Sequence, residues 1–147
     1  MAGLTEGRIL GLDYGAKTVG VAVTDGLGLT AVSLETIKRE HENHLRSTYR
    51  RLAELISQYA VKQVVVGLPL NMDGSEGERA RLTREFAKEL ERRTGAGIIF
   101  QDERLTTVEA SEILSLTGKR TDDPKERIDA VAAAIILTDF LDRKRDG

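Results

Sequence analysis

Acidic residues end two apolar segments of this sequence and begin a third. Asp13 comes at the end of the run RILGLD, Asp102 and Glu103 follow the run GIIFQ, and Asp129 begins the alanine-rich segment DAVAAAIIL. Carboxylates that a fold gathers together repel one another and are costly to ionise unless a cation lies between them. A divalent metal ion bound through oxygen ligands removes that cost, so these residues suggest metal-ion chemistry.

The other potential metal ligands narrow the choice of ion. The 147 residues include no cysteine and only two histidines, His41 and His44, which share the polar stretch EHENH at the start of a predicted surface helix. We assign neither histidine to a metal. Oxygen ligands alone favour Mg²⁺ or Mn²⁺ over Zn²⁺.

The pattern of apolar residues predicts the elements that must position the acids. Apolar runs of strand length predict strands, and apolar residues at helical spacing predict helices. In chain order these are strands over 8–14, 17–25 and 29–37, a helix over 42–60, a strand over 63–68, a helix from Ser75 to about Gly95, a strand over 97–103, and helices over 106–116 and 123–143. Ser75 with Glu78 is a predicted capping box, and Asp123 and Pro124 are the predicted N-cap and first residue of the last helix.

This order predicts an α/β fold, a mixed five-stranded sheet flanked by helices on both faces. The first three strands form an antiparallel meander, and helical crossovers then make strand 97–103 parallel to strand 8–14 at the centre of the sheet. The C-terminal ends of parallel strands share one edge, where ligands bind. Asp13 would therefore lie beside Asp102 or Glu103. Alternation puts these two neighbours on opposite faces and leaves the choice between them open.

The last helix brings the third acid to the same place. Asp129 shares its apolar stripe with the residues at helical spacing, Ala132, Ala133, Ile136 and Phe140. That stripe should pack against the sheet. The small alanines allow a close approach, which would carry Asp129 toward Asp13.

Each of these acids also has a simpler interpretation. An aspartate before a glycine at the end of a strand is commonly a turn residue, and Asp102 with Glu103 could begin a solvated loop. Asp129 could pair with Lys125, one turn earlier on the helix surface. The hypothesis of a metal site depends on the convergence of all three positions on one edge of the sheet.

Length and composition predict a single domain over residues 1–147 of a soluble, cytoplasmic protein. The chain is long enough to bury a full core and too short for two domains of ordinary size. Its N-terminus lacks the basic and apolar regions of a signal peptide, and its longest apolar run, AVAAAIIL, is too short to cross a membrane. With a net charge of −2, the chain can bind nucleic acid only through a local basic patch.

Four segments, in order, closely resemble the YqgF family, also known as RuvX-like Holliday junction resolvases or pre-16S rRNA nucleases. They are LDYGAKTVGVAV, GLPLNMDGSEG, DERLTT and KERIDAVAAAIIL, and they span nearly the whole chain. The resemblance implies a ribonuclease H-like fold and an acidic triad of Asp13, Glu103 and Asp129, and so favours Glu103 over Asp102. It further implies a metal-dependent nuclease that processes the 5′ end of pre-16S rRNA or resolves Holliday junctions.

The residues that the resemblance implies suit phosphodiester hydrolysis. Two Mg²⁺ or Mn²⁺ ions about 3.5 to 4 Å apart can activate water on one side of the phosphorus and stabilise the leaving oxygen on the other. Asp13 would contact both ions, and Glu103 and Asp129 one each. Candidate contacts to the polyanionic substrate are Lys17, Asn71, Arg104, Lys119, Arg120 and Lys125. Because aromatic residues make up only 4% of the chain, recognition should depend on the backbone rather than on base stacking.

Two other classes of protein stay open at this point. The segment LDYGAKTVGVAV also resembles the first phosphate-binding motif of actin-like ATPases and sugar kinases, although 147 residues leave no room for the second domain of that fold. The other alternative is a nucleic-acid-binding module without turnover. Nucleotide binding would indicate the first class, and nucleic-acid binding without metal-dependent cleavage the second. A junction resolvase would also need to form a two-fold homodimer, for which the sequence shows no long apolar stripe.

Overall fold

The computed structural model describes residues 7–103 and 124–146, with side chains for 7–103 and 131–144. The predicted helix over 106–116 and the predicted N-cap Asp123 lie outside the described residues.

The described strands form one mixed sheet in the order β3-β2-β1-β4-β5. They are β1 (Arg8–Tyr14), β2 (Thr18–Thr24), β3 (Ala31–Lys38), β4 (Val61–Leu68) and β5 (Gly97–Asp102). The pairs β1–β2 and β2–β3 are antiparallel, whereas β1–β4 and β4–β5 are parallel. The predicted five-stranded sheet, with its first strand at the centre and β5 parallel to it, is confirmed.

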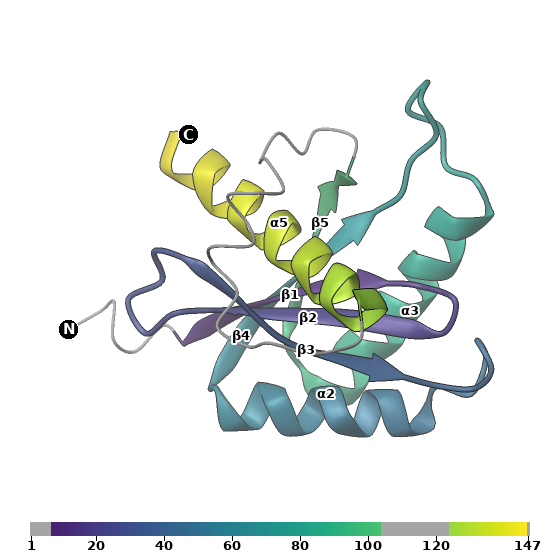
Figure 1. Cartoon of the computed structure of the whole chain (residues 1–147), viewed down its shortest axis with the longest axis horizontal. Helices are drawn as coiled ribbons and strands as arrows, with labels where there is room; N and C mark the ends of the chain where they lie inside the picture. Colours follow the sequence, from purple (N-terminus) through teal and green to yellow (C-terminus); the bar gives the residue numbers. More distant parts are fainter. Residues whose placement is uncertain (1–6, 104–123, 147) are drawn as a thin grey trace.

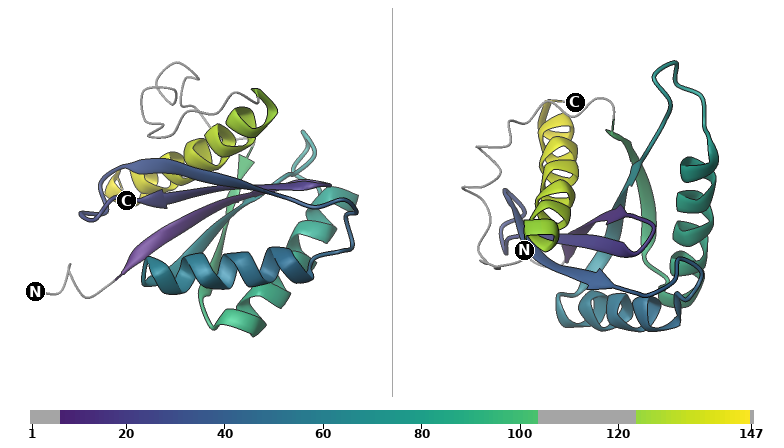
Figure 2. Two further views of the ribbon diagram at one scale, coloured as in Figure 1. Left: turned by 60° about the horizontal axis from the view of Figure 1, so that its bottom comes forward. Right: turned by 45° about the vertical axis from the view of Figure 1, so that its right-hand side comes forward.

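Helices cover both faces of this sheet. The helices α2 (Arg46–Gln58) and α3 (Glu78–Thr94) lie on one face, and α5 (Pro124–Asp146) crosses the other, as Figures 1 and 2 show. Side chains alternate between the two faces of each strand, so Leu10 and Leu12 of β1 enter the core that contains residues of α2 and α3. Ile9 packs instead in the cluster formed with α5. Burial on both faces explains why β4 reads as a continuous apolar run.

The helix α5 lies directly on the backbone of the central strand. A Cβ atom at Gly11 would lie 2.8 Å from Cβ of Leu137 and 3.2 Å from the carbonyl oxygen of Ala133. Ala133 and Ala134 are fully buried, so the close approach predicted from the alanines is confirmed. It brings α5 near the end of β1 that carries Asp13.

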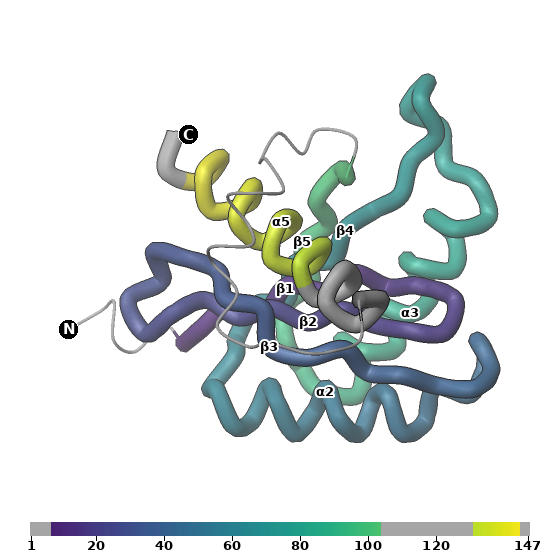
Figure 3. Tube along the Cα trace, in the orientation of Figure 1, coloured from purple at the N-terminus to yellow at the C-terminus, as the bar shows by residue number. Residues whose placement is uncertain are grey.

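The start of α3 differs from the prediction. The capping box of Ser75 and Glu78 is wrong, because the N-cap is Gly77, without a side-chain cap hydrogen bond, and the helix begins at Glu78. Ser75 instead donates its backbone N–H and its hydroxyl to Oδ1 of Asp73, at 2.9 and 2.6 Å. This local turn uses the serine within the connection between β4 and α3, which projects beyond the sheet in Figure 3.

The helix α5 begins at Pro124, as predicted, and continues past the predicted end at Arg143 to Asp146. Among the helices of the described ranges, none is both long and apolar enough to cross a membrane.

Candidate active site

Asp13 lies one residue before the end of β1, at the edge of the sheet where β1, β4 and β5 all finish. Leu12 is paired with Val66 of the parallel strand β4, so Asp13 lies level with Gly67. The side chain of Asp13 is half-buried. By alternation with Gly11 it belongs to the face that α5 covers.

Glu103 follows β5 directly, and its carboxylate lies over Gly67 of the intervening strand. A Cβ atom at position 67 would lie 2.5 Å from Cδ1 of Ile136 in α5, and closer still to Oε1 of Glu103. Any side chain at this position would occupy the space that the carboxylate fills. The glycine therefore lets Glu103 reach across β4 toward Asp13.

The two carboxyl groups interact strongly. Burial raises the pKa of Glu103 to about 7, and the negative charge of Asp13 and a hydrogen bond between the two groups contribute to the same shift, followed by the charge of Asp102. Two carboxylates that share a site cannot both ionise easily without a cation. The structure therefore places the carboxyl groups of Asp13 and Glu103 next to each other.

The structure also distinguishes the two neighbouring acids. Glu103, rather than Asp102, provides the carboxyl group that bonds to Asp13. Asp102 is the last residue of β5, paired with Leu68 of β4, and alternation assigns it to the opposite face. The charge of Asp102 contributes to the raised pKa of Glu103.

The third predicted acid is placed by its backbone alone. Asp129 lies in α5, one turn before Ala133, and α5 packs on β1 at Ala133. The side chains of Asp129 and Lys125 lie outside the described residues. Within the described part of the chain no group of three or more His, Cys, Asp or Glu side chains could hold a metal ion, so the contribution of Asp129 to a three-carboxylate site stays a prediction.

The predicted substrate contacts are only partly described. Lys17 is exposed in the turn between β1 and β2, next to the edge that carries Asp13. Asn71 is exposed and donates a hydrogen bond from Nδ2 to Oγ of Ser75 at 3.0 Å, which organises the loop before α3. Arg104, Lys119 and Arg120 lie outside the described residues.

A buried polar network beside the site was not anticipated from the sequence. Asp139 of α5 is only 4% exposed and accepts hydrogen bonds from Nε2 of Gln101 at 2.5 Å and from Nε of Arg143 at 3.0 Å. Gln101 lies two residues before Glu103 on the same face of β5. The network joins α5 to β5 next to the carboxylate pair. In the sequence, the one indication of this network is the polar residue Gln101 within an otherwise apolar strand.

The shared proton predicts an unusual pH dependence of stability in metal-free protein. Because the pKa of Glu103 is about 7 in the folded state and lower when the chain is unfolded, the folded protein binds more protons between about pH 4.5 and 7. The free energy of unfolding should therefore fall as pH rises through this range, by about 1 to 2 kcal/mol after allowance for partial exposure. Glu103→Gln should remove this fall when denaturation midpoints are measured in EDTA at pH 5 and pH 8.

The control for this measurement is Glu91→Gln, on the exposed surface of α3. It should keep the pH dependence of the wild type. The same dependence in Glu103→Gln would show that the carboxylate pair does not control it.

Comparison with known proteins identifies close relatives. A family model described as RuvX, Holliday junction resolvase, matches residues 7–143. A protein from Lachnospira eligens named "Putative pre-16S rRNA nuclease" is 52% identical over 138 residues, which cover 94% of this chain and 99% of that protein. A protein of the same name from Lactococcus lactis subsp. cremoris is 47% identical over 135 residues, covering 92% of this chain and 94% of the relative.

Two solved structures share the fold. RuvC of T. thermophilus, in complex with a Holliday junction substrate, aligns with a TM-score of 0.66 and 17% identity over 95% of this chain and 96% of the other. Ydc2, the yeast mitochondrial Holliday junction resolvase, aligns with a TM-score of 0.54 and 12% identity over 92% and 78% of the two chains. At these identities the likeness concerns the fold alone, and the predicted ribonuclease H-like fold is confirmed.

Proposed function

The chain belongs to the RuvX family of Holliday junction resolvases, and from this membership in a family of nucleases we propose that it hydrolyses phosphodiester bonds of structured nucleic acid where Asp13 and Glu103 meet. We further propose that one domain carries this activity.

The pairing of Asp13 with Glu103 is the observation that supports this proposal. The pair offers oxygen ligands only, and Glu103 retains a proton near neutral pH because of burial and the charge of Asp13. A hard divalent cation fits such a donor set. Its positive charge would replace the proton and offset the repulsion between the two carboxylates. When bound, Mg²⁺ or Mn²⁺ would supply positive charge for the phosphate and for activation of water.

The residues of the chain then have separate tasks. Asp13, on the central strand, would be a ligand of both metal ions. Glu103, in its deprotonated form, would be a ligand of one of them. Asp129 is the proposed ligand from α5. Lys17, exposed in the turn that follows β1, would contact a phosphate of the substrate.

We propose the precursor of 16S rRNA as the substrate, cleaved on the 5′ side. The choice of pre-16S rRNA follows the name carried by relatives that are 52% and 47% identical to the chain, and the 5′ side follows the family resemblance of the sequence. The description of the family favours a four-way DNA junction as the second candidate. Junction resolution places one additional demand on the protein, because two paired strands must be cut by a two-fold homodimer.

A direct comparison of the two substrates tests the proposal. The purified full chain is incubated with a pre-16S rRNA fragment and with a synthetic four-way DNA junction, each in Mg²⁺, Mn²⁺ or EDTA. Metal-dependent cleavage of the RNA is the expected result, and symmetric paired nicks in the junction would assign the second candidate. Binding of either substrate without cleavage under any condition would contradict the nuclease proposal, and nucleotide binding in place of both would favour the actin-like alternative.

Asp129→Asn should abolish cleavage and leave the metal-free protein at least as stable as the wild type. The reason is that the change removes one of three repelling charges with almost no change in shape. Cleavage rates and metal-free denaturation midpoints are measured beside those of Lys125→Ala. If Asp129 paired with Lys125 instead, both variants would cleave normally and lose only a few tenths of a kcal/mol of stability.

A further inference from the structure

A second group of charged residues surrounds the end of β1 on the opposite face from the carboxylate pair. Tyr14, the residue after Asp13, is only 7% exposed and enters the core under α2 and α3. Its ring stacks on that of Phe86, with centroids 4.3 Å apart and an angle of 13° between the planes. The guanidinium groups of Arg39 and Arg79 also lie near the Tyr14 ring, 4.9 and 5.5 Å from its centroid.

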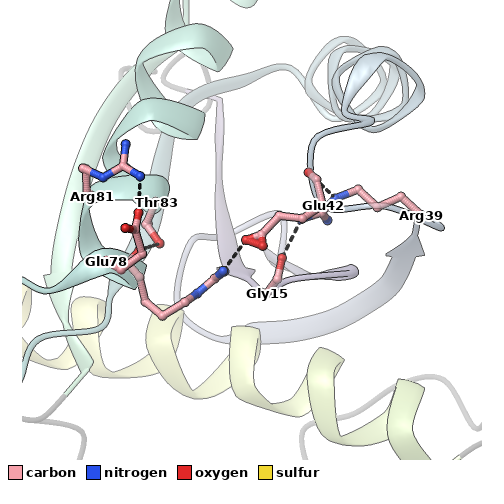
Figure 4. Close-up of polar contacts among 7 residues, drawn as sticks. Gly15, Arg39, Glu42, Glu78, Arg81 and Thr83 are labelled. Carbon is pink, nitrogen blue, oxygen red and sulfur yellow. Dashed lines mark hydrogen bonds and ion pairs between the residues drawn. The ribbon is translucent and has the colours of Figure 1, made fainter.

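Arg39 is held in place by backbone oxygens. Its Nη2 donates to the carbonyl of Gly15 at 2.6 Å and its Nε to the carbonyl of Glu42 at 3.1 Å, as Figure 4 shows. The residue is only 8% exposed. Its Nη1 is buried and has no hydrogen-bond partner in the part of the chain that the structure describes.

Arg79 approaches the same ring from the first turn of α3. Its Nη1 forms an ion pair with the carboxylate of Glu42. Its Nη2, like Nη1 of Arg39, is buried without a hydrogen-bond partner among the described residues. A buried charged donor without an acceptor costs free energy comparable to a lost hydrogen bond, so two such donors around one tyrosine ring require an explanation.

The charges around Tyr14 favour an anion. The guanidinium groups of Arg39 and Arg79 both lie at the Tyr14 ring, and the carboxylate of Glu42 pairs with only one of them. The dipole of α3 adds a partial positive charge at its nearby N-terminus, where Gly77 provides no capping side chain and Glu78 is the acidic residue of the first turn. The side chains of Arg79 and Glu42 are 40% and 33% exposed, so they can shift to admit a ligand.

We propose that Arg39 and Arg79 form a phosphate site for the nucleic acid, separate from the carboxylate pair and on the other face of the same sheet edge. Guanidinium groups match the oxygens of a phosphate through paired N–H donors, and the two unpartnered nitrogens would supply such donors. When no substrate is bound, the carboxylate of Glu42 pairs with the guanidinium of Arg79, and it therefore competes with the phosphate for this group. The site rests on the proposed function, since it extends the contact between the protein and its nucleic-acid substrate.

Binding measurements without metal test the site apart from catalysis. Affinity of the full chain for a labelled RNA hairpin is measured in EDTA over a series of salt concentrations. Arg79→Gln should weaken binding about tenfold at low salt and reduce the slope of log K against log salt by about one. Glu42→Gln should tighten binding, because it removes the competing carboxylate.

The matched control is Arg81→Gln, on the same helix. Arg81 is 57% exposed and pairs with Glu78 and Glu85 on the surface of α3, so its loss should leave affinity and slope unchanged. Equal affinities and salt slopes for Arg79→Gln and Arg81→Gln would overturn the site. Arg39 and Arg79 would then only stabilise the turn after β1. Weaker binding by Glu42→Gln would overturn the proposed competition and, with it, the site.

The source of the phosphate is resolved with two forms of the same hairpin, carrying a 5′-hydroxyl or a 5′-phosphate. An equal effect of Arg79→Gln on both forms assigns the site to an internal phosphodiester, and an effect on the phosphorylated form alone assigns it to a terminal phosphate. Because binding in EDTA requires no turnover, absence of cleavage would contradict the proposed function without changing these results.

Discussion

Asp13→Asn is expected to reduce metal-dependent cleavage at least about 10³-fold, equivalent to about 4 kcal/mol of transition-state stabilisation. The metal-free variant should be at least as stable as the wild type, because the charge that repels Glu103 is lost. Mg²⁺ or Mn²⁺ should raise the melting temperature of the wild type by binding the native state. In Asp13→Asn this shift should disappear.

Thermal melts and cleavage assays with and without metal measure both effects. The control is Asp142→Asn, at an exposed position of α5, which should keep the activity and the metal-induced shift of the wild type. An undiminished shift in Asp13→Asn would place the metal elsewhere. Retained cleavage would exclude Asp13 from the active site.

Gly67→Ala is expected to reduce cleavage at least about 10²-fold, although it removes no functional group. The added Cβ would overlap the position of the Glu103 carboxylate and Cδ1 of Ile136, and so would displace the carboxylate from Asp13. Overpacking should also lower the stability by about 1 to 3 kcal/mol. The metal-induced rise in melting temperature should be smaller than in the wild type.

A second glycine provides the control for this effect. Gly11→Ala places a Cβ 2.8 Å from Cβ of Leu137, so it overpacks the same helix without touching Glu103. At a temperature where both variants are folded, Gly11→Ala should cleave far better than Gly67→Ala. If Gly67 acts through Glu103, the double variant Gly67→Ala/Glu103→Gln should be no less active than Glu103→Gln. Additive losses would contradict this positioning role.

The strands could be predicted from the sequence because the pattern of apolar residues in each strand follows directly from which of its faces are buried. All five predicted strands lie within two residues of the observed bounds. A strand covered on one face alternates between apolar and polar residues, and a strand covered on both faces is a continuous apolar run. The order of the elements then required β1 at the centre of the sheet. That requirement was sufficient to bring Asp13 to the same edge as the acids at the end of β5.

Features that depend on contacts between distant side chains could not be predicted in this way. Alternation separated Asp102 from Glu103 but gave no sign of which face α5 would cover, and that choice came from the family resemblance. The capping box at Ser75 failed because a local turn with Asp73 competes for the same hydroxyl. Arg39 gave no signal either, since a basic residue after a strand usually lies in solvent.

The position of β1 at the centre of the sheet also determines when a growing chain can bring Asp13 and Glu103 together. The strand β1 is synthesised well before its parallel partner β4, the acid after β5 and the helix α5. Pairing between segments so distant in sequence is slow, because a long loop must close before any contact forms. A nascent chain on the ribosome that has exposed only β1 to β3 holds Asp13 without Glu103. The two carboxyl groups therefore stay apart until β5 and the residue after it have emerged.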